Sequence, residues 1–225
     1  GITTSSWIFD CMILQAGGKL ISDDGKKALF NSNEARESLD YLIKTLKEVA
    51  YKTQGFDNQN DFIAGKNGIV VGSCVSKAFM EKDIKFNYGI APLPGFRKNG
   101  VIVSGTNVVI FKKDPEKEAA AWKFLKWFTE PAQTAFWSLK TSYVPVRRSA
   151  LETPLMRDAF AGDPRLKAPI SQLEYSDYEP RMPEWYNGRQ ILEQTLDKAL
   201  TEKGDSMTYL NEANEKINLE LNPGK

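Results

Sequence analysis

Strand candidates are few in this sequence, and they are scattered among many helical segments. Alternation and β-branched content identify only about five of them. The clearest are the apolar run at 68–71 and the interrupted run VIVSGTNVVIF at 101–111. Strands embedded among helices indicate an α/β fold. Because so few strands make a small sheet for so many helices, we expect the sheet to be completed by residues outside this chain.

Helices can be located from the spacing of apolar residues. Apolar side chains that recur about every three or four positions lie on one face of a helix. Capping residues add support, because Asp114 can cap a helix whose first residue is Pro115, where a missing N–H has no consequence. The other helices that we expect span residues 5–15, 33–49, 58–64, 188–202 and 206–221.

The composition excludes several classes of site. Lys and Arg number 30 and Asp and Glu number 29, so the net charge of +1 gives no reason to expect a nucleic-acid partner. The sequence has no histidine, which excludes Ser-His-Asp and Cys-His catalysis and histidine-ligated zinc. The cysteines, Cys11 and Cys74, fit no metal-ligand spacing. We therefore expect neither a metal nor a cofactor.

Two other functions fit parts of the sequence. Paired carboxylates can hydrolyse a glycosidic bond, and a glycoside hydrolase fragment would use Glu174, Glu179 or Glu184. Prolines interrupt their segment, YSDYEPRMPEW, so we expect a solvated loop instead. An interaction module would dock through exposed aromatic side chains, although an amphipathic helix turns most such residues into core. These residues are Trp122, Phe124, Trp127, Phe136 and Trp137.

Several blocks of sequence occur in an order and spacing that extend over almost all of the chain. They are TTSSWIFDCMILQAGGKL, FIAGKNGIVVGSCVS followed by KFNYGIAPLPG, SGTNVVIFK, TSYVPVRRSA and GRQILEQTLDKAL. Together they resemble the family 1 extracellular solute-binding proteins of ABC transporters. Within that family, the sequence is similar to the subgroup that binds glycerol 3-phosphate.

The resemblance implies a periplasmic-binding-protein-like (type II) fold with two lobes, here without the N-terminal half that completes the first lobe. It assigns the chain to the lobes in four segments. Residues 1–86 belong to the second lobe, 87–100 form a crossover or hinge, 101–142 return to the first lobe, and 143–225 finish in the second.

The resemblance also implies a function without catalysis. The whole protein is expected to bind a small polyol or sugar, with a glycerol phosphate or its diester as the first candidate and a neutral mono- or oligosaccharide as the alternative. Its partners would be the transmembrane subunits of an ABC permease. We expect a monomer in the periplasm or a lipoprotein anchored outside the cell, whose signal sequence is not in this chain.

Two residues that the resemblance assigns to the ligand lie in the first third of the chain. Trp7 would line the cleft, although a tryptophan on an apolar helix can equally belong to a core. The subgroup has a second tryptophan where this chain has Thr4, which changes one wall of the expected pocket. Ser73 follows the strand expected at 68–71, where ligands of α/β sheets tend to bind. Its alternative role is to cap a helix.

Three further candidates lie in the middle of the chain. Gly105 lets the backbone approach a ligand closely, and the alternative is a β-bulge in a crossing strand. Thr106 would add a side-chain hydrogen bond. Tyr143 offers an apolar ring and one hydroxyl to a hydroxylated ligand, and the alternative is an anchor at the hinge.

Arg189 is the last candidate. We expect it in the first turn of a helix that begins at Asn187-Gly188, where the helix dipole disfavours a cation. An anionic group on the ligand would reverse this, because it would bind both the helix N–H groups and the guanidinium. The family resemblance also assigns ligand binding to this arginine. The alternative is a surface arginine bonded near Glu184.

Overall fold

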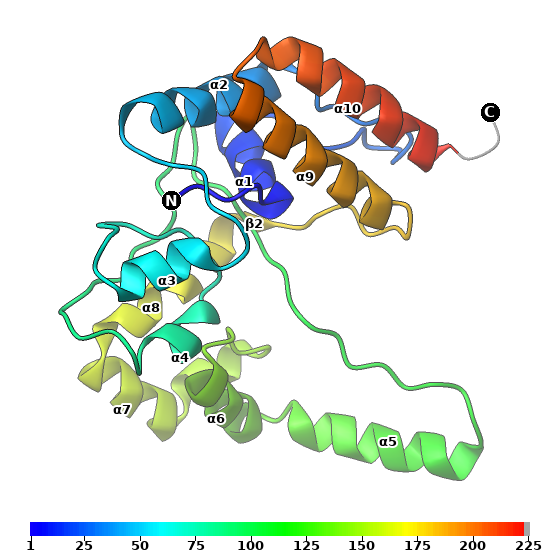
Figure 1. The fold of residues 1–225 in the computed structure, drawn as a ribbon. Helices are drawn as coiled ribbons and strands as arrows, with labels where there is room; N and C mark the ends of the chain where they lie inside the picture. Colours follow the sequence, from blue (N-terminus) through cyan, green and yellow to red (C-terminus); the bar gives the residue numbers. More distant parts are fainter. Residues whose placement is uncertain (223–225) are drawn as a thin grey trace. The chain divides into compact units, whose positions relative to one another are not determined.

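The computed structural model describes residues 1–222 and is mostly helical (Figure 1). The chain divides into two compact units, which we describe separately. Unit 1 consists of Gly1–Val71, Leu93–Ser104 and the C-terminal segment from Leu173, and unit 2 consists of Gly72–Pro92 and Gly105–Gln172.

Unit 1 contains the helices that the apolar periodicity predicted. They are α1 (Ser6–Ala16), α2 (Asn33–Glu48), α3 (Asp57–Ile63), α9 (Trp185–Glu202) and α10 (Ser206–Leu221). The ends of these helices follow from local chemistry. The Ser32 hydroxyl accepts a hydrogen bond from the Ala35 N–H at 3.2 Å, which caps α2. Gly17 ends α1 with a φ of 95°, a left-handed conformation that favours glycine.

The core of unit 1 lies between α1, α2, α9 and α10, and α9 and α10 pack side by side (Figure 1). Phe9, Leu39 and Leu210 are fully buried there. The Trp185 ring, at the start of α9, stacks on Phe30 with 5.7 Å between the ring centroids. The amphipathic stripes predicted from sequence are thus the surfaces that build this core.

The only strands among the described residues are a short parallel pair in unit 1. β1 (Val101–Ile102) pairs with β2 (Ser176–Asp177) in the register Val101 to Ser176 and Ile102 to Asp177. The strands expected at 68–71 and over the remainder of 101–111 do not form in the described residues. A strand needs a neighbour to pair its N–H and C=O groups, and these two segments have none there.

Unit 2 consists of short helices around a small core. Its helices are α4 (Ser76–Met80), α5 (Pro115–Phe128), α6 (Pro131–Thr141), α7 (Pro154–Gly162) and α8 (Lys167–Ser171), with 3-10 turns at Arg148–Glu152 and Pro164–Leu166. A third 3-10 turn, Gln172–Tyr175, leads back to unit 1. The predicted cap of α5 is present, since the Asp114 carboxylate accepts from the Lys117 N–H at 2.9 Å. The buried apolar cluster contains Ala135, Ala150 and Met156.

The limits of the two units differ from the lobe boundaries that we expected at 86, 100 and 142. Residues 143–172 lie in the same compact unit as 105–142, and residues 1–71 are separated from 72–86. These limits describe how this chain is folded by itself. The assignment of its segments to the lobes of a whole protein therefore stays a prediction.

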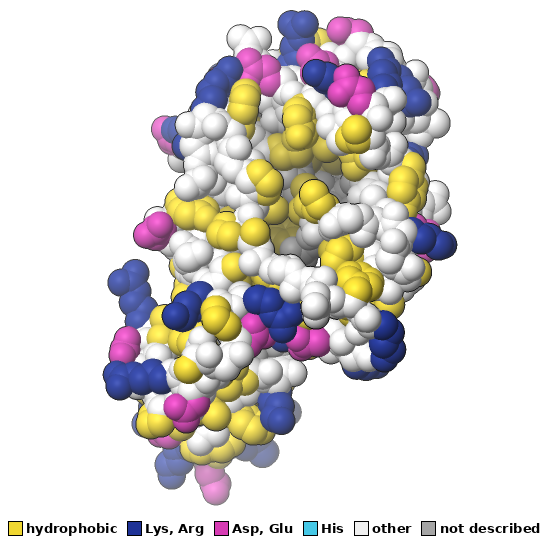
Figure 2. All heavy atoms as spheres, turned by 90° about the vertical axis from the view of Figure 1, so that its left-hand side faces the viewer, with side chains coloured by type: hydrophobic (Ala, Val, Ile, Leu, Met, Phe, Trp, Pro, Cys, Tyr) yellow, Lys and Arg dark blue, Asp and Glu magenta, His cyan; other side chains and the backbone are white. Residues whose placement is uncertain are grey.

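Surface charge and apolar length give two further facts. Basic and acidic side chains are interspersed on the face that Figure 2 shows, in keeping with the net charge of +1. None of the helices in residues 1–222 is both long and apolar enough to cross a bilayer.

Candidate ligand-binding residues

Trp7 lies on α1, and the indole N–H of its ring is hydrogen-bonded to the strand β1. Its indole N–H donates to the carbonyl oxygen of Ile102 at 2.9 Å. The N–H of Ile102 in turn donates to the Cys11 sulfur at 3.2 Å, so β1 is bonded to α1 from both sides of one residue. Trp7 is half-buried and packs against the core of unit 1. The indole N–H is thus used within the protein, and the ring surface is what Trp7 can offer to a solute.

Arg189 is paired with a carboxylate. Its Nη2 donates to the Glu179 Oε1 at 3.0 Å, and the two side chains are 36% and 15% exposed. Glu179 is one of the carboxylates that we expected in a solvated loop, so this part of the expectation is wrong. The partner of Arg189 is Glu179 and not the Glu184 region. The charge of Arg189 is thus compensated at close range by Glu179.

The position of Arg189 in its helix also differs from the prediction. α9 begins at Trp185, so Arg189 lies beyond the first turn and the helix dipole acts on it less strongly. Gly188 is an interior residue of this helix. A Cβ on Gly188 would lie 3.0 Å from the Trp185 ring, so the glycine lets that ring pack. Asn-Gly usually breaks a helix, but Asn187-Gly188 lies inside α9, where the glycine leaves room for the Trp185 ring.

The sequence analysis missed a polar strip between α1 and α9. Ser6 and Asp10 are four residues apart on α1, and Arg189 and Glu193 are four residues apart on α9, so each pair lies on one helix face. The two helices pack against each other, and the Ser6 hydroxyl donates to Glu193 Oε1 at 3.1 Å. An aspartate inside an otherwise apolar helix was the signal that could have revealed this strip.

Asp10 is the most unusual member of the strip. It is 0% exposed, and neither carboxylate oxygen has a hydrogen-bond partner among the described residues. Burial raises the pKa of Asp10 well above its usual value; Glu179 and Glu193 add to this rise, and Arg189 opposes it. The Nε of Arg189 is also buried and lacks a partner in the same part of the chain.

In unit 2 the structure brings Gly105, Thr106 and Tyr143 together. The hydroxyl groups of Thr106 and Tyr143 are 3.2 Å apart, and a Cβ on Gly105 would lie 3.9 Å from the Tyr143 ring. The backbone of Gly105 is not left-handed, and this contact distance is ordinary, so the fold itself does not require a glycine. The expected β-bulge is absent as well, because residues 103–111 form no strand.

Ser73 is exposed and has a structural role of its own. Its hydroxyl accepts from the Val75 N–H at 3.3 Å, just before α4. This is close to the capping role that the sequence left open. The N-cap residue of α4 is Val75, whose side chain makes no capping hydrogen bond. No interaction joins Ser73 to Thr106 or Tyr143 in the described residues. Trp7 and Arg189 belong to unit 1, and the other four candidates belong to unit 2.

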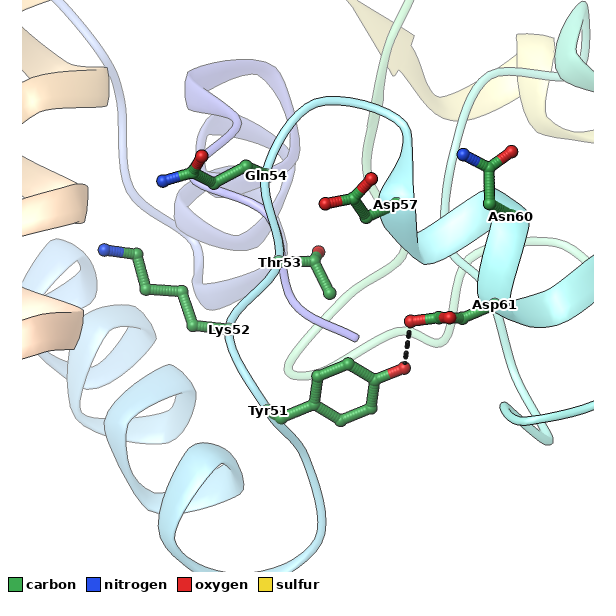
Figure 3. Close-up of a pocket in the computed structure, with 7 residues that line it drawn as sticks. All are labelled: Tyr51, Lys52, Thr53, Gln54, Asp57, Asn60 and Asp61. Carbon is green, nitrogen blue, oxygen red and sulfur yellow. Dashed lines mark hydrogen bonds between the residues drawn. The ribbon is translucent and has the colours of Figure 1, made fainter.

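A polar hollow in unit 1 of about 480 Å³ was not expected from the sequence (Figure 3). Tyr51, Lys52, Thr53 and Gln54 line it from the segment before α3, and Asp57, Asn60 and Asp61 line it from α3. The Tyr51 hydroxyl donates to Asp61 at 2.6 Å across this hollow. Lys52 from this lining also pairs with Asp197 on α9 at 2.6 Å.

The structure provides no cluster of ligands for a metal in residues 1–222. Both cysteines are free thiols, with Cys11 in unit 1 and Cys74 in unit 2. Burial raises the pKa of Cys11 to about 11, so its thiol stays protonated and unreactive at neutral pH.

Comparison with known proteins finds several sequence relatives, and two of them represent two kinds of solute. The maltotriose-binding protein of Pyrococcus abyssi is 27% identical over 158 residues, which cover 67% of this chain and 35% of that protein. The sn-glycerol-3-phosphate-binding periplasmic protein UgpB of Salmonella typhimurium is 28% identical over 139 residues, which cover 57% of this chain and 32% of that protein.

A solved structure establishes the fold. The cyclic alpha-maltosyl-1,6-maltose binding protein from Arthrobacter globiformis superposes with a TM-score of 0.85 at 24% identity, covering 97% of this chain and 56% of that one. The fold is therefore the periplasmic-binding-protein-like (type II) α/β fold that the sequence predicted. This chain spans about half the length of that solved protein.

Residues 1–168 also match the model of a protein family described as bacterial extracellular solute-binding protein. This match covers most of the chain and includes all the candidate residues except Arg189. It agrees with the two relatives, both of which are named for the solutes that they bind. The chain belongs to the family of bacterial extracellular solute-binding proteins.

Proposed function

We propose that the whole protein is the solute-binding component of an ABC importer and that it binds a small hydroxylated solute without chemical change. The family match over residues 1–168 is the observation that carries this proposal. Aromatic rings and hydroxyl groups among the candidate residues support it, since both suit the faces and edges of a sugar or polyol.

The state of Arg189 bears on the charge of that solute. Its guanidinium is already paired with Glu179, so a neutral saccharide needs no further charge at this position. We therefore propose a neutral mono- or oligosaccharide as the first candidate. A glycerol phosphate or its diester is the second, because the buried Nε of Arg189 has no partner in the described residues and one relative is named for glycerol 3-phosphate.

We assign ligand contacts to the residues that the family resemblance indicates. Aromatic stacking belongs to Trp7 and Tyr143, hydrogen bonds from side chains to Ser73, Thr106 and Arg189, and a main-chain contact to Gly105. The hydroxyl pair of Thr106 and Tyr143 supports this assignment, because two adjacent hydroxyls can donate and accept toward a vicinal diol.

The remaining parts of the proposal concern the setting. The transmembrane subunits of a permease would receive the solute, and the whole protein would act as a monomer in the periplasm or as a lipoprotein outside the cell. The extracellular or periplasmic location of the family and of its relatives supports this. Catalysis by Glu179 is disfavoured, because its carboxylate is held by Arg189.

Calorimetric titration of the whole protein tests the proposed ligand. We expect maltotriose to bind, and Arg189→Ala to weaken it by roughly tenfold or less, since a neutral hydroxyl contact is modest. A glycerol phosphate would instead lose roughly ten- to a hundredfold on the same substitution. Arg157→Ala is the matched control, because Arg157 is exposed and paired with Glu152. Absence of binding to both solute classes would contradict the proposal.

A further inference from the structure

Three orphan polar atoms occur in the strip between α1 and α9. They are the two carboxylate oxygens of Asp10 and the Nε of Arg189, all buried and without partners in residues 1–222. Buried polar atoms are nearly always hydrogen-bonded in folded proteins, because an unpaired one has lost its bonds to water without replacing them. A donor and two acceptors left unpaired in the same strip call for an explanation that involves both side chains.

The two side chains are chemically complementary. Asp10 and Arg189 interact electrostatically, and within residues 1–222 Arg189 is the cation that favours the ionised form of Asp10. Glu179 accepts a hydrogen bond from the Nη2 of Arg189. The Nε–H of the same guanidinium is a further donor, which a second carboxylate can accept from. Glu193 is the acidic residue of the strip on α9, and its Oε1 accepts from the Ser6 hydroxyl. Asp10 therefore offers two unpaired acceptor oxygens in the same strip as the unpaired Nε–H.

We propose that Asp10 is a proton-dependent positioning residue for Arg189. When Asp10 is protonated, only Glu179 holds the guanidinium, as in this structure. When Asp10 is ionised, it accepts the Nε–H, and the guanidinium is held by two carboxylates in one orientation. The remaining N–H groups of Arg189 then point in a fixed direction.

The surroundings of Asp10 determine where this change occurs. Two acidic groups act against its ionisation, Glu179 after β2 and Glu193 on α9, and Arg189 on α9 favours it. Burial also acts against ionisation, and the pKa of Asp10 is raised well above its usual value. The exchange of partners therefore takes place above the range in which ordinary carboxylates titrate, which is about pH 4.

The proton-linked contact does not need a ligand, whereas its consequence for affinity rests on the proposed function. The first measurement is therefore made on the whole protein without solute. The Arg189 Nε–H resonance, identified by its loss in Arg189→Lys, is followed by nitrogen–proton NMR between about pH 5 and 9. We expect it to titrate in the wild type and to stay constant in Asp10→Asn, which resembles the protonated acid and cannot ionise.

Asp23→Asn is the matched control, because Asp23 lies in the same unit and its side chain is 87% exposed. It should leave the titration unchanged. A wild-type resonance that does not titrate would overturn the proposal, and so would the same titration in Asp10→Asn. The wild-type curve alone decides the matter if Asp10→Asn does not fold.

The second measurement is the affinity for maltotriose, which carries no titratable group, at about pH 5.5 and 8.5. We expect the wild type to bind more tightly at the higher pH, by less than the roughly tenfold that loss of the whole Arg189 side chain costs. Asp10→Asn should bind equally at both pH values. A pH dependence shared by both proteins would overturn the role in positioning. If maltotriose does not bind at all, the proposed solute fails, while the NMR titration still decides whether Asp10 holds Arg189.

Discussion

Units 1 and 2 contain similar apolar residues but bury them very differently. In unit 1, Phe9, Ile13 and Leu210 are fully buried in one continuous cluster. In unit 2 the buried cluster is small, and large side chains such as Phe111 and Trp122 are 81% and 52% exposed. The helix α5 buries no residue at all, although it carries three of the exposed aromatic rings.

The difference shows which features of a fold are local and which need a partner. α5 forms because Asp114 caps it, Pro115 starts it and alanines fill its first turns. None of these signals depends on a neighbouring surface. The burial of Trp122 and Phe111 does depend on one, and apolar faces of this extent are uncommon on soluble monomers. We expect unit 2 to be covered by other polypeptide in the whole protein.

The largest expected effect is on the free energy of unfolding, and it compares a substitution in the core of unit 1 with one in unit 2. Leu210→Ala in unit 1 removes a fully buried side chain and should lower the free energy of unfolding by about 2–5 kcal/mol. Leu155→Ala in unit 2 is the matched substitution, at a position that is 45% exposed, and should cost less than about 1 kcal/mol. Denaturant unfolding of the 225-residue chain measures both. Equal losses would mean that the two units do not differ as described.

A smaller effect comes from the buried carboxyl of unit 1. Because the pKa of Asp10 is raised by folding, the folded chain keeps a proton that the unfolded chain releases. Stability should therefore fall as pH rises from about 4 toward the raised pKa. Asp10→Asn removes this dependence and should be more stable than the wild type near neutral pH by about 1–3 kcal/mol. Thermal melts at several pH values test it, and parallel curves for the two proteins would contradict it.

The smallest effect on stability is expected on the exposed face of unit 2. Phe111→Ser should change the free energy of unfolding of the 225-residue chain by less than about 0.5 kcal/mol, because the ring is in contact with solvent. It should nevertheless reduce self-association and binding of a hydrophobic dye, both of which we expect of this chain by itself. In the whole protein the same substitution should be clearly destabilising. A chain that is monomeric and does not bind the dye would contradict the account of unit 2.

The sequence predicted the features that depend on local chemistry. The helix at 33–49 and the Asp114 cap follow from periodicity and capping, and the structure confirms both. The α/β class was inferred from strands among the helices, and the solved structure with the same fold confirms it. The prediction of a strand at 68–71 was wrong, because an apolar run forms a buried strand only when a neighbouring strand is present. Local composition does not provide that neighbour.

The site was predicted less completely than the fold. The pairing of Arg189 with Glu179 joins residues separated by the start of α9, and no spacing rule reveals it. Gly188 was misread because Asn-Gly usually marks a helix boundary, whereas here the glycine accommodates the Trp185 ring. Asp10 was hidden among apolar neighbours. The Arg189 pair and the burial of Asp10 depend on how separate segments pack, whereas Gly188 depends on a ring three residues earlier in its own helix.

The central claim is that the whole protein binds a hydroxylated solute and releases it unchanged. Equilibrium dialysis against maltotriose, followed by chromatography of the bound fraction, tests both halves of this claim together. Our account predicts saturable binding, with maltotriose recovered intact after long incubation. Recovery of glucose or maltose would contradict it by showing hydrolysis, and failure to retain either maltotriose or glycerol 3-phosphate would contradict it by showing that no such solute binds.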